Sequence, residues 1–282
     1  MSKANKNQRD FWSGNGGQIW VERQKAMDTM LSPLGKTALN KLNLSDKDNV
    51  LDIGCGCGNT TLNIAKKIQP SGKVTGLDIS EPMLKKANES AKEMSLTNTT
   101  FRCLDVQTDY IGEEIYTVAF SRFGVMFFED PIAAFRNINK SLISGAFLSF
   151  VCWQSPSLNP WQSIFIQEVR KVIDLPSLPP RSPGPFAFGE SEYVTSILEE
   201  SNFKNIEIDG QTLEVKMFSG RSLSEAVKDY LSINPVVNEM LKDSPEEQKT
   251  EIVNSTINAF SPYYSEKGLI FPSATWLVKA KK

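Results

Sequence analysis

The central part of the chain alternates short apolar runs with amphipathic segments. Between residues 49 and 153, mostly apolar runs are separated by stretches in which apolar side chains recur at helical spacing. This alternation predicts βαβ units around a mostly parallel sheet. The expected strands are Val50–Ile53, Lys73–Asp78, Thr100–Leu104, Tyr116–Ser121 and Gly145–Trp153.

The segments between these strands carry helix signals. Thr60–Gln69 spaces its apolar residues along one helix face, and a second helix is expected from Ser80, as N-cap, to Met94, with Pro82 in its first turn. A third helix is expected from Asp130 to Leu142. The three predicted helices thus follow the first, second and fourth predicted strands, an arrangement that suits a doubly wound sheet.

Beyond Trp153 the pattern becomes less regular. Proline recurs from Pro156 onward and is densest in Leu175–Pro185, which predicts a long excursion of the kind that forms lids or binding loops. The α/β pattern then resumes. We expect a helix at Glu192–Asn202, a strand within Ile206–Lys216, a helical excursion over Leu223–Phe260 and a last strand at Ala274–Ala280.

Composition narrows the classes of protein. Lysine plus arginine number 31 and aspartate plus glutamate 33, with no basic stretch that would neutralise many phosphates, so nucleic acid is not an expected partner. No run approaches the ~20 apolar residues of a membrane span, and the N-terminus has no apolar signal segment. A cytoplasmic location is expected.

The chain has no histidine, which excludes histidine-based nucleophilic or acid–base catalysis. Its four cysteines, Cys55, Cys57, Cys103 and Cys152, form no CxxC pair, and reduced thiols are expected. Because Cys55 and Cys57 stand as C-x-C inside a glycine loop, we expect no zinc or other metal.

A glycine loop is the most informative feature of the sequence. A strand that ends near Asp52 runs into Gly54-Cys55-Gly56-Cys57-Gly58 and then directly into a helix. Glycines at such a turn allow the backbone to approach a ligand closely. The alternative is a tight strand-to-helix turn with no ligand.

Two details bear on the ligand. The dinucleotide pattern G-x-G-x-x-G requires glycine where this chain has Asn59. The carboxylate of Asp52 would repel a pyrophosphate but attract the ammonium and sulfonium groups of S-adenosylmethionine. Otherwise, Asp52 is a buried acid bonded to backbone amides.

Asp78 ends the second predicted strand, where doubly wound folds place an acid that accepts hydrogen bonds from ribose hydroxyls. The alternative is a surface acid that caps the next turn.

With these motifs, Val50–Trp153 resembles the class I S-adenosylmethionine-dependent methyltransferases, particularly the small-molecule branch (type 11/25-like) with quinone, sterol and amine methylating relatives. The resemblance implies a Rossmann-like, doubly wound, seven-stranded, mostly parallel sheet with an antiparallel last strand and helical lid insertions. It implies S-adenosyl-L-methionine as the cofactor. It also implies a single domain over residues 1–282. In this domain, segment 1–48 is helical and covers the cofactor, segment 49–153 binds the cofactor, and segments 154–191 and 217–268 are lid and substrate insertions.

The resemblance also assigns residues. Asp52, Gly54 and Gly56 match the motif that holds the methionine portion, and Ser121-Arg122-Phe123 match the segment beneath it. Asp78 matches the ribose acid, with Ile79 beside the adenine, which Asp105 and Val106 bracket. Phe11-Trp12 and Trp20 resemble an aromatic lead-in over the cofactor, although core packing explains Trp20 equally well. The full expected cofactor set is Trp20, Asp52, Gly54, Cys55, Gly56, Asp78, Ile79, Met83, Asp105, Val106, Ser121 and Arg122.

The acceptor side is less defined. Methyl transfer from a sulfonium is an in-line displacement that mainly requires alignment, so a dedicated catalytic residue is not essential. Arg122 would either orient an anionic acceptor or serve as a structural donor. If a base is needed, the candidates are Glu129, Asp130, Tyr263 and Tyr264. Five aromatic residues suggest that the acceptor pocket is apolar or aromatic: Phe127, Trp153, Trp161, Phe186 and Phe188. The alternative is that these residues only pack in the core.

The favoured function is therefore methylation of a small molecule. The alternatives are a methyltransferase that acts on a protein, tRNA or lipid headgroup, a cofactor-binding module without turnover, and a nicotinamide oxidoreductase. The sequence names neither the acceptor nor the oligomeric state.

Overall fold

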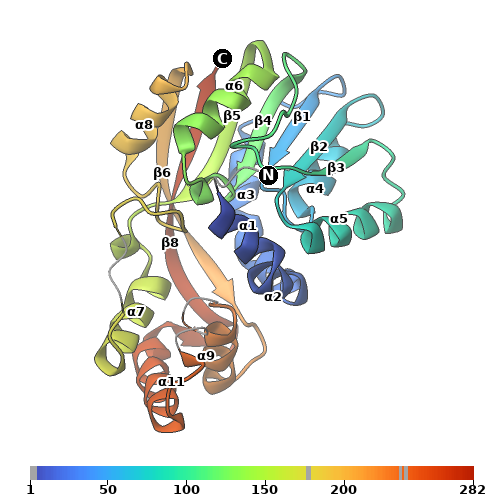
Figure 1. The fold of residues 1–282 in the computed structure, drawn as a ribbon. Coiled ribbons are helices and arrows are strands. Elements are labelled where there is room, and N and C mark those ends of the chain that lie inside the picture. Colours follow the sequence, from blue (N-terminus) through green and yellow to red (C-terminus); the bar gives the residue numbers. More distant parts are fainter. Residues whose placement is uncertain (1–4, 176–178, 235–236, 238–240) are drawn as a thin grey trace.

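The computed structural model in Figure 1 describes residues 5–175, 179–234, 237 and 241–282. Two stretches expected from the sequence, Leu175–Pro185 and Leu223–Phe260, lie partly outside the described residues.

One sheet organises the molecule. Within the described residues it has eight strands in the order β3-β2-β1-β4-β5-β8-β6, with β7 paired on β8. The pairs from β3 to β5 are parallel, whereas β8 is antiparallel to both β5 and β6. This confirms the doubly wound, mostly parallel sheet with an antiparallel last strand. The strands are β1 (Asn49–Ile53), β2 (Lys73–Asp78), β3 (Thr99–Cys103), β4 (Tyr116–Arg122), β5 (Leu142–Trp153), β6 (Lys204–Met217), β7 (Tyr264–Ser265) and β8 (Gly268–Lys281).

Helices cover both sides of the sheet, with α6 and α8 packed together beside β5 and β6 (Figure 1). No helix in the described parts of the chain is both long and apolar enough to cross a membrane. The helices are α1 (Lys6–Ser13), α2 (Asn15–Glu22), α3 (Gln24–Asn40), α4 (Asn59–Lys67), α5 (Glu81–Glu93), α6 (Pro131–Ser141), α7 (Pro160–Val172), α8 (Ser191–Glu200), α9 (Leu223–Ser232) and α11 (Glu246–Phe260), with short 3₁₀ turns η1 (Val125–Phe127), η2 (Pro156–Leu158) and η3 (Ser261–Tyr263).

The core lies where the central strands are covered on both faces. Leu51 of β1, Phe120 of β4 and Phe150 of β5 are fully buried. Strands buried on both faces need largely apolar sequences, which is clearest in β5, whereas β1 and β4 also carry Asp52 and Ser121 near their carboxyl ends. The carboxyl ends of β1 and β4 consequently meet at one edge, at the point where the strand order reverses.

Helix α7 differs from the irregular structure that the sequence predicted after Trp153. Pro156 and Pro160 stand in the first turns of η2 and α7, where proline has no hydrogen bond to lose. The fully buried side chain of Asn159 accepts the Ala274 N–H at 3.0 Å and so ties the start of α7 to β8. The prolines therefore start helices here and do not merely interrupt them.

The last strand is longer than Ala274–Ala280 because it extends beyond the main sheet. The β5 pairing ends at Trp153 opposite Thr275, whereas β6 and β8 stay paired as far as Met217 and Leu269. Helices α7, α9 and α11 pack around this two-stranded extension, at the bottom of Figure 1. We call α7, α9, α11 and the extension the cap.

Aromatic rings fill the interior of the cap. The ring of Tyr230 lies 5.1 Å from that of Phe165 and 5.4 Å from that of Phe260, and Phe271 lies 4.8 Å from Phe260. The Tyr230 hydroxyl donates to the Trp161 carbonyl at 2.8 Å. The cap therefore has a small core of its own, connected to the sheet through β6 and β8.

Candidate functional site

The glycine loop joins the end of β1 to α4. Gly54, Gly56 and Gly58 have φ of +63°, +54° and +82°, which side-chain-bearing residues rarely adopt. A Cβ at Gly54 would lie 2.8 Å from the Gly124 Cα. At Gly56 the nearest atoms would be Met83 Sδ at 3.7 Å and Trp20 Nε1 at 3.9 Å. Gly56 thus faces a space flanked by two residues of the expected cofactor set.

Asp78 ties the loop to the end of β2. It is 8% exposed, and its Oδ2 accepts the Gly56 N–H at 2.8 Å while its Oδ1 accepts the Ser80 N–H at 2.9 Å. Burial raises the pKa of this carboxyl, and the backbone hydrogen bonds oppose that rise. Ser80 stands at the N-cap position of α5, but its hydroxyl donates to the Trp12 carbonyl at 2.6 Å and makes no cap bond.

Asp52 is the most deeply buried acid of the loop. It is 1% exposed and its Oδ2 accepts the Thr61 hydroxyl at 2.6 Å. Burial raises its pKa to about 7, against the lowering effects of that hydrogen bond and of Arg122. Near neutral pH this carboxyl exists in both protonation states, so a cation brought beside it would favour the charged form.

Cys55 contributes through its backbone. Its N–H donates to the Leu77 carbonyl at 3.0 Å, and its Sγ would contact a Cβ at Gly76 of β2, so the thiol is turned into the sheet. Burial raises the pKa of this thiol well above its ordinary value. The thiol therefore stays protonated.

Ser121 and Arg122 at the end of β4 are both engaged in the structure. The Ser121 hydroxyl donates to the Ile53 carbonyl at 2.8 Å, which holds β4 against the end of β1. The Arg122 guanidinium donates to Asp28 of α3 at 2.9 Å and to Asn59 of α4 at 3.2 Å, and its side chain is only 10% exposed. These bonds favour the structural interpretation of Arg122 over a free anion-binding role.

The N-terminal helices bring aromatic rings to the loop. Trp12 of α1 lies 6.0 Å from Trp20 of α2 and 5.1 Å from Phe127 of η1, all edge to face. The Ser13 hydroxyl donates to the Ile79 carbonyl at 3.1 Å, just beyond Asp78. Helices α1 and α2 therefore lie over the carboxyl ends of β1 and β2.

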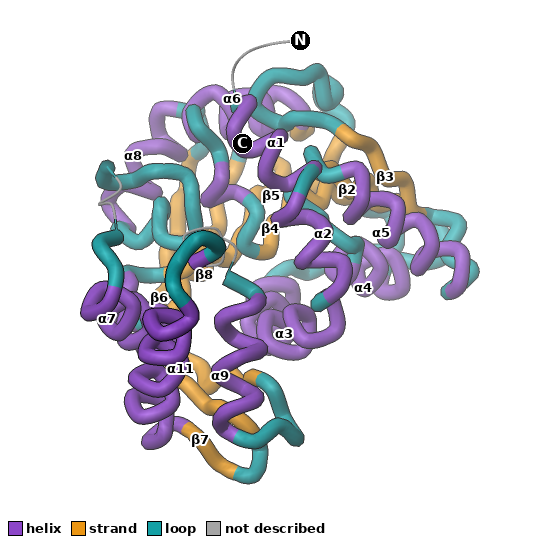
Figure 2. The backbone as a smooth tube through the Cα atoms, turned by 60° about the horizontal axis from the view of Figure 1, so that its bottom comes forward, coloured by secondary structure: helices purple, strands orange, loops and turns teal. Residues whose placement is uncertain are grey.

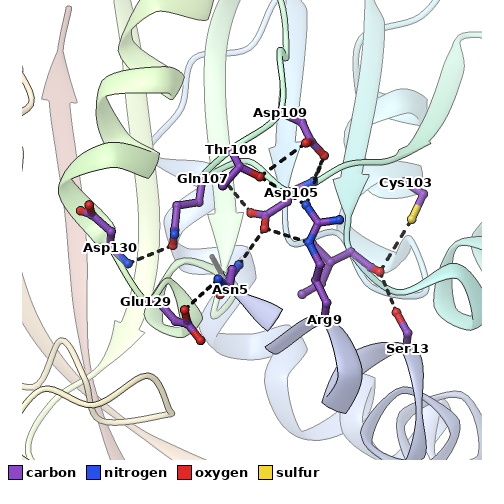
Figure 3. Close-up of polar contacts among 11 residues, drawn as sticks. Asn5, Arg9, Ser13, Cys103, Asp105, Gln107, Thr108, Asp109, Glu129 and Asp130 are labelled. Atoms are coloured by element: carbon purple, nitrogen blue, oxygen red, sulfur yellow. Dashed lines mark hydrogen bonds and ion pairs between the residues drawn. The ribbon is translucent and has the colours of Figure 1, made fainter. Parts of the chain in front are cut away.

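Asp105, just beyond β3, binds two residues of the first helical segment, Asn5 and Arg9 (Figure 3). Its buried Oδ2 accepts Asn5 Nδ2 at 3.1 Å and Arg9 Nε at 3.2 Å, and its Oδ1 accepts the Gln107 N–H at 2.9 Å. The neighbouring Val106 is buried, and its carbonyl accepts Asn137 Nδ2 at 2.7 Å. The start of α1 and the end of β3 thus share one polar cluster.

A row of aromatic rings leads from the end of β4 toward the cap. Phe123 stacks on Trp153 at 4.4 Å, Trp153 meets Trp161 at 4.9 Å, and Trp161 lies 5.8 Å from Phe186. Phe123 has φ of +60°, a conformation that costs a bulky residue free energy and that clusters at functional sites. We call these four residues the aromatic row. Phe188 lies elsewhere, against Phe135 and Phe150.

The candidate bases lie away from the loop or are engaged in other bonds. Glu129 Oε2 accepts the Asn5 N–H at 2.8 Å, and Asp130 Oδ1 accepts the Ala133 N–H as the N-cap of α6. Tyr263 stacks on Phe271, and the Tyr264 hydroxyl donates to the Arg221 carbonyl, both on the outer part of the cap.

Several residues of this site carry no sequence signal. Thr61 follows Asp52 by nine positions in a helix and looks like any helical threonine. Asn5, Arg9 and Asp28 precede the sheet by tens of residues, and only the fold brings them to Asp105 and Arg122.

Comparison with known proteins places the chain. Residues 44–172 match the model of a family described as a methyltransferase domain. The demethylmenaquinone methyltransferase of Listeria welshimeri is 28% identical over 138 residues, which are 49% of this chain and 58% of that protein. The aklanonic acid methyltransferase of a Streptomyces strain is 27% identical over 119 residues, 42% of this chain and 54% of that protein. The chain therefore aligns with little more than half of the length of these relatives.

Among solved structures, the phosphoethanolamine N-methyltransferase 2 of Haemonchus contortus, in complex with S-adenosyl-L-methionine, shares the fold with a TM-score of 0.58. It is 17% identical, and the match covers 97% of this chain and 59% of that one. The glycine loop with its two buried acids lies inside the matched segment of the family. Over residues 44–172 the chain is thus similar to methyltransferase domains, and its fold is that of a class I, S-adenosylmethionine-dependent methyltransferase.

Proposed function

We propose that this protein transfers a methyl group from S-adenosylmethionine to a small acceptor with an apolar or aromatic body. One observation carries the proposal: Asp52 and Asp78 are buried beside a positive-φ glycine loop, and each is held by neutral donors. A buried carboxylate in that state is stabilised by a cationic ligand and repels a pyrophosphate. S-adenosylmethionine carries an ammonium and a sulfonium, and no phosphate.

The residues present suit this cofactor. Each Asp78 oxygen accepts one backbone N–H, so lone pairs remain for two ribose hydroxyls. Gly56 leaves room between Met83 and Trp20 for a ligand close to the backbone. Trp12 and Trp20 offer apolar cover that would exclude water from the methionine end. Asp52 would meet the ammonium group.

The acceptor class rests on the aromatic row. Phe123, Trp153 and Trp161 begin one residue beyond Arg122 and continue to the insertion after β5. These three rings are buried and pack on one another, so a flat, apolar ligand would have to insert beside them. The relatives named for demethylmenaquinone and aklanonic acid support a small-molecule acceptor.

The cofactor supplies a methyl group on a sulfonium, which is an excellent leaving group. The residues of the chain therefore have to align the acceptor and exclude water, and proton removal needs help only when the acceptor is weakly acidic. Because Glu129 and Asp130 bond to backbone N–H groups, we assign no general base. An acceptor with a ring hydroxyl or an activated carbon fits best.

The test combines binding with transfer. Calorimetry should show that S-adenosylhomocysteine binds and NAD does not, and binding of NAD alone would overturn the proposal. Labelled S-adenosylmethionine is then offered with a hydroquinone, an aromatic hydroxy acid, phosphoethanolamine, bulk RNA and a protein extract. Label is expected in the ring compounds. Label only in phosphoethanolamine, RNA or protein would replace the acceptor class, and binding without any transfer would indicate a non-catalytic module.

A substitution pair separates the acceptor side from the cofactor side. Trp153→Ala should lower transfer about tenfold or more while the affinity for S-adenosylhomocysteine stays within about twofold, because Trp153 belongs to the aromatic row. Trp276→Phe is the control, since its indole N–H donates to the Gly189 carbonyl outside the row. Equal loss in both variants would mean that the rings only support the fold.

A further inference from the structure

Asn5, at the N-cap position of α1, is a buried polar residue. It is 2% exposed, has φ of +59° and lies between Glu129 and Asp105 (Figure 3). Its backbone N–H donates to Glu129 Oε2 and its Nδ2 donates to Asp105 Oδ2. This second bond fixes the orientation of the amide, because the reverse orientation would place its carbonyl oxygen against the carboxylate.

The carbonyl oxygen of the Asn5 side chain lacks a hydrogen-bond partner among the residues that the structure describes, which begin at Asn5 itself. Asn5 Oδ1 is buried and accepts no hydrogen bond from any of them. Buried polar atoms in native proteins nearly always have partners, so an isolated acceptor that is held in a fixed orientation indicates a donor that binds there.

The position of Asn5 connects it to the cofactor site. Strands β2 and β3 end side by side, with Asp78 opposite Cys103 and the Leu104 N–H bonded to the Asp78 carbonyl at 3.0 Å. Helix α1 crosses these ends, from Ser13 at the Ile79 carbonyl to Asn5 at Asp105. A nucleoside whose ribose is held by Asp78 would therefore extend its base along α1 toward Asn5.

The polar groups at this end match an amine. Asp105 already accepts three hydrogen bonds, from Asn5, Arg9 and the Gln107 N–H, which leaves about one of its four lone-pair positions. A 6-amino purine brings two hydrogens and can serve both that position and Asn5 Oδ1. The oxygen of a 6-oxo purine is itself an acceptor, so the Asp105 carboxylate and Asn5 Oδ1 would repel it.

We propose that Asn5 is a specificity-determining residue that reads the 6-amino group of the purine through Oδ1 and thereby holds α1 closed over the bound cofactor. This inference rests on the proposed function, because it assumes that the site takes S-adenosylmethionine. It adds a residue from outside the matched methyltransferase segment to the binding of the base.

The experiment compares two ligands that differ at the 6-position of the purine and in the proton on the adjacent N1. Calorimetry measures S-adenosylhomocysteine and S-inosylhomocysteine, in which an oxygen replaces the amine, against the full chain. Asn5→Gly removes the amide and retains the positive φ without strain. We expect it to weaken S-adenosylhomocysteine about tenfold and S-inosylhomocysteine less than about threefold, so that selectivity falls. Lys6→Ala, which removes an exposed pair with Asp10 on the same helix, should keep wild-type selectivity.

Asn5→Ser, whose side chain is too short to reach the amine, provides a second substitution with the same expected loss, and melting temperatures report whether each variant is folded. If both ligands weaken equally, Asn5 only tethers α1 and the inference is wrong. Unchanged affinities would also overturn it. If the wild-type chain binds neither ligand, the proposed function fails, and the inference fails with it.

Discussion

The two ends of the N-terminal cover hold carboxylates in opposite ways. At the loop, Asp52 and Asp78 accept hydrogen bonds from a hydroxyl and from backbone N–H groups, all neutral. Beyond β3, Asp105 is paired with the guanidinium of Arg9 at 3.2 Å. An acid paired with a cation at short range has no need of a cationic ligand, whereas buried acids that are hydrogen-bonded only to neutral groups favour one, and Arg122 only partly offsets the burial of Asp52. We therefore propose that the charged part of the cofactor lies at the loop.

The same contrast separates the cofactor side from the cap. The loop offers glycines and acids, whereas the aromatic row and the cap interior offer rings. Figure 2 shows α9 of the cap beside α3, and Arg23, between α2 and α3, lies 3.7 Å from Asp229 of α9. Because the two sides differ in chemistry and this ion pair is partly exposed, we still expect a substitution on one side to leave the function of the other largely intact.

The largest expected effect is at Asp78. Asp78→Ala removes the acceptor of two backbone hydrogen bonds, from the Gly56 N–H of the loop and from the Ser80 N–H, together with the proposed ribose acceptor. These interactions are together worth about 3 kcal/mol, or about a hundredfold in the dissociation constant of S-adenosylhomocysteine. Calorimetry measures the constant, and circular dichroism checks the fold. A folded variant with unchanged affinity would remove Asp78 from the site.

A smaller loss of affinity is expected at the glycine loop. In Gly56→Ala, a Cβ enters the space between Met83 and Trp20, and we expect S-adenosylhomocysteine to bind about tenfold more weakly. Gly145→Ala is the control, because Gly145 has φ of +78° and nothing lies within 4 Å of its added Cβ. Both variants should lose about 1 kcal/mol of stability from the left-handed backbone. Equal affinities in the two variants would show that Gly56 does not face the ligand.

The raised pKa of Asp52 predicts a pH dependence. An ammonium group binds to the charged form of this carboxylate. Affinity for S-adenosylhomocysteine should therefore rise about tenfold from about pH 6 to pH 8, because Asp52 titrates near pH 7. Below about pH 7, binding should release the Asp52 proton. Asp52→Asn should abolish this dependence. An equal slope in the variant would assign the titration to another group.

Stability should respond with the opposite sign. The folded chain keeps the Asp52 proton up to about pH 7, whereas the unfolded chain releases it near the ordinary aspartate pKa of 3.8. The contribution of this group to stability is therefore complete below the unfolded pKa and is lost as pH rises through about 7. Without ligand, Asp52→Asn should melt at a higher temperature than wild type at pH 8 but not at pH 4. Thermal scans at both values would test this.

The smallest effect is expected from the cap. Tyr230→Phe removes the buried hydrogen bond from the Tyr230 hydroxyl to the Trp161 carbonyl, which should cost about 1–2 kcal/mol of stability. The affinity for S-adenosylhomocysteine should remain that of wild type. Denaturant unfolding and calorimetry measure the two quantities, and a large loss of cofactor affinity would mean that the two sides are coupled.

The sequence by itself determined the parallel core and its glycine loop. Strands buried on both faces need apolar runs, and left-handed turns need glycine, so Leu51, Gly54 and Gly56 carry their structural role in their own chemistry. The antiparallel last strand was also expected, although the resemblance and not the pattern supplied it. Asp52 and Asp78 could be chosen because they lie at the ends of two recognisable strands.

The tertiary structure decided what depends on contacts between distant segments. Residues such as Asn5, Arg9 and Asp28 are ordinary polar residues in sequence, and only the fold places them on Asp105 and Arg122. The extension of β6 and β8 beyond β5 likewise depends on pairing between strands far apart in the chain. Local patterns report which face of an element is apolar, whereas a partner across the fold leaves no local trace. The glycine loop and its acids could therefore be predicted from the sequence, whereas the contacts that hold the N-terminal helices and the cap in place could not.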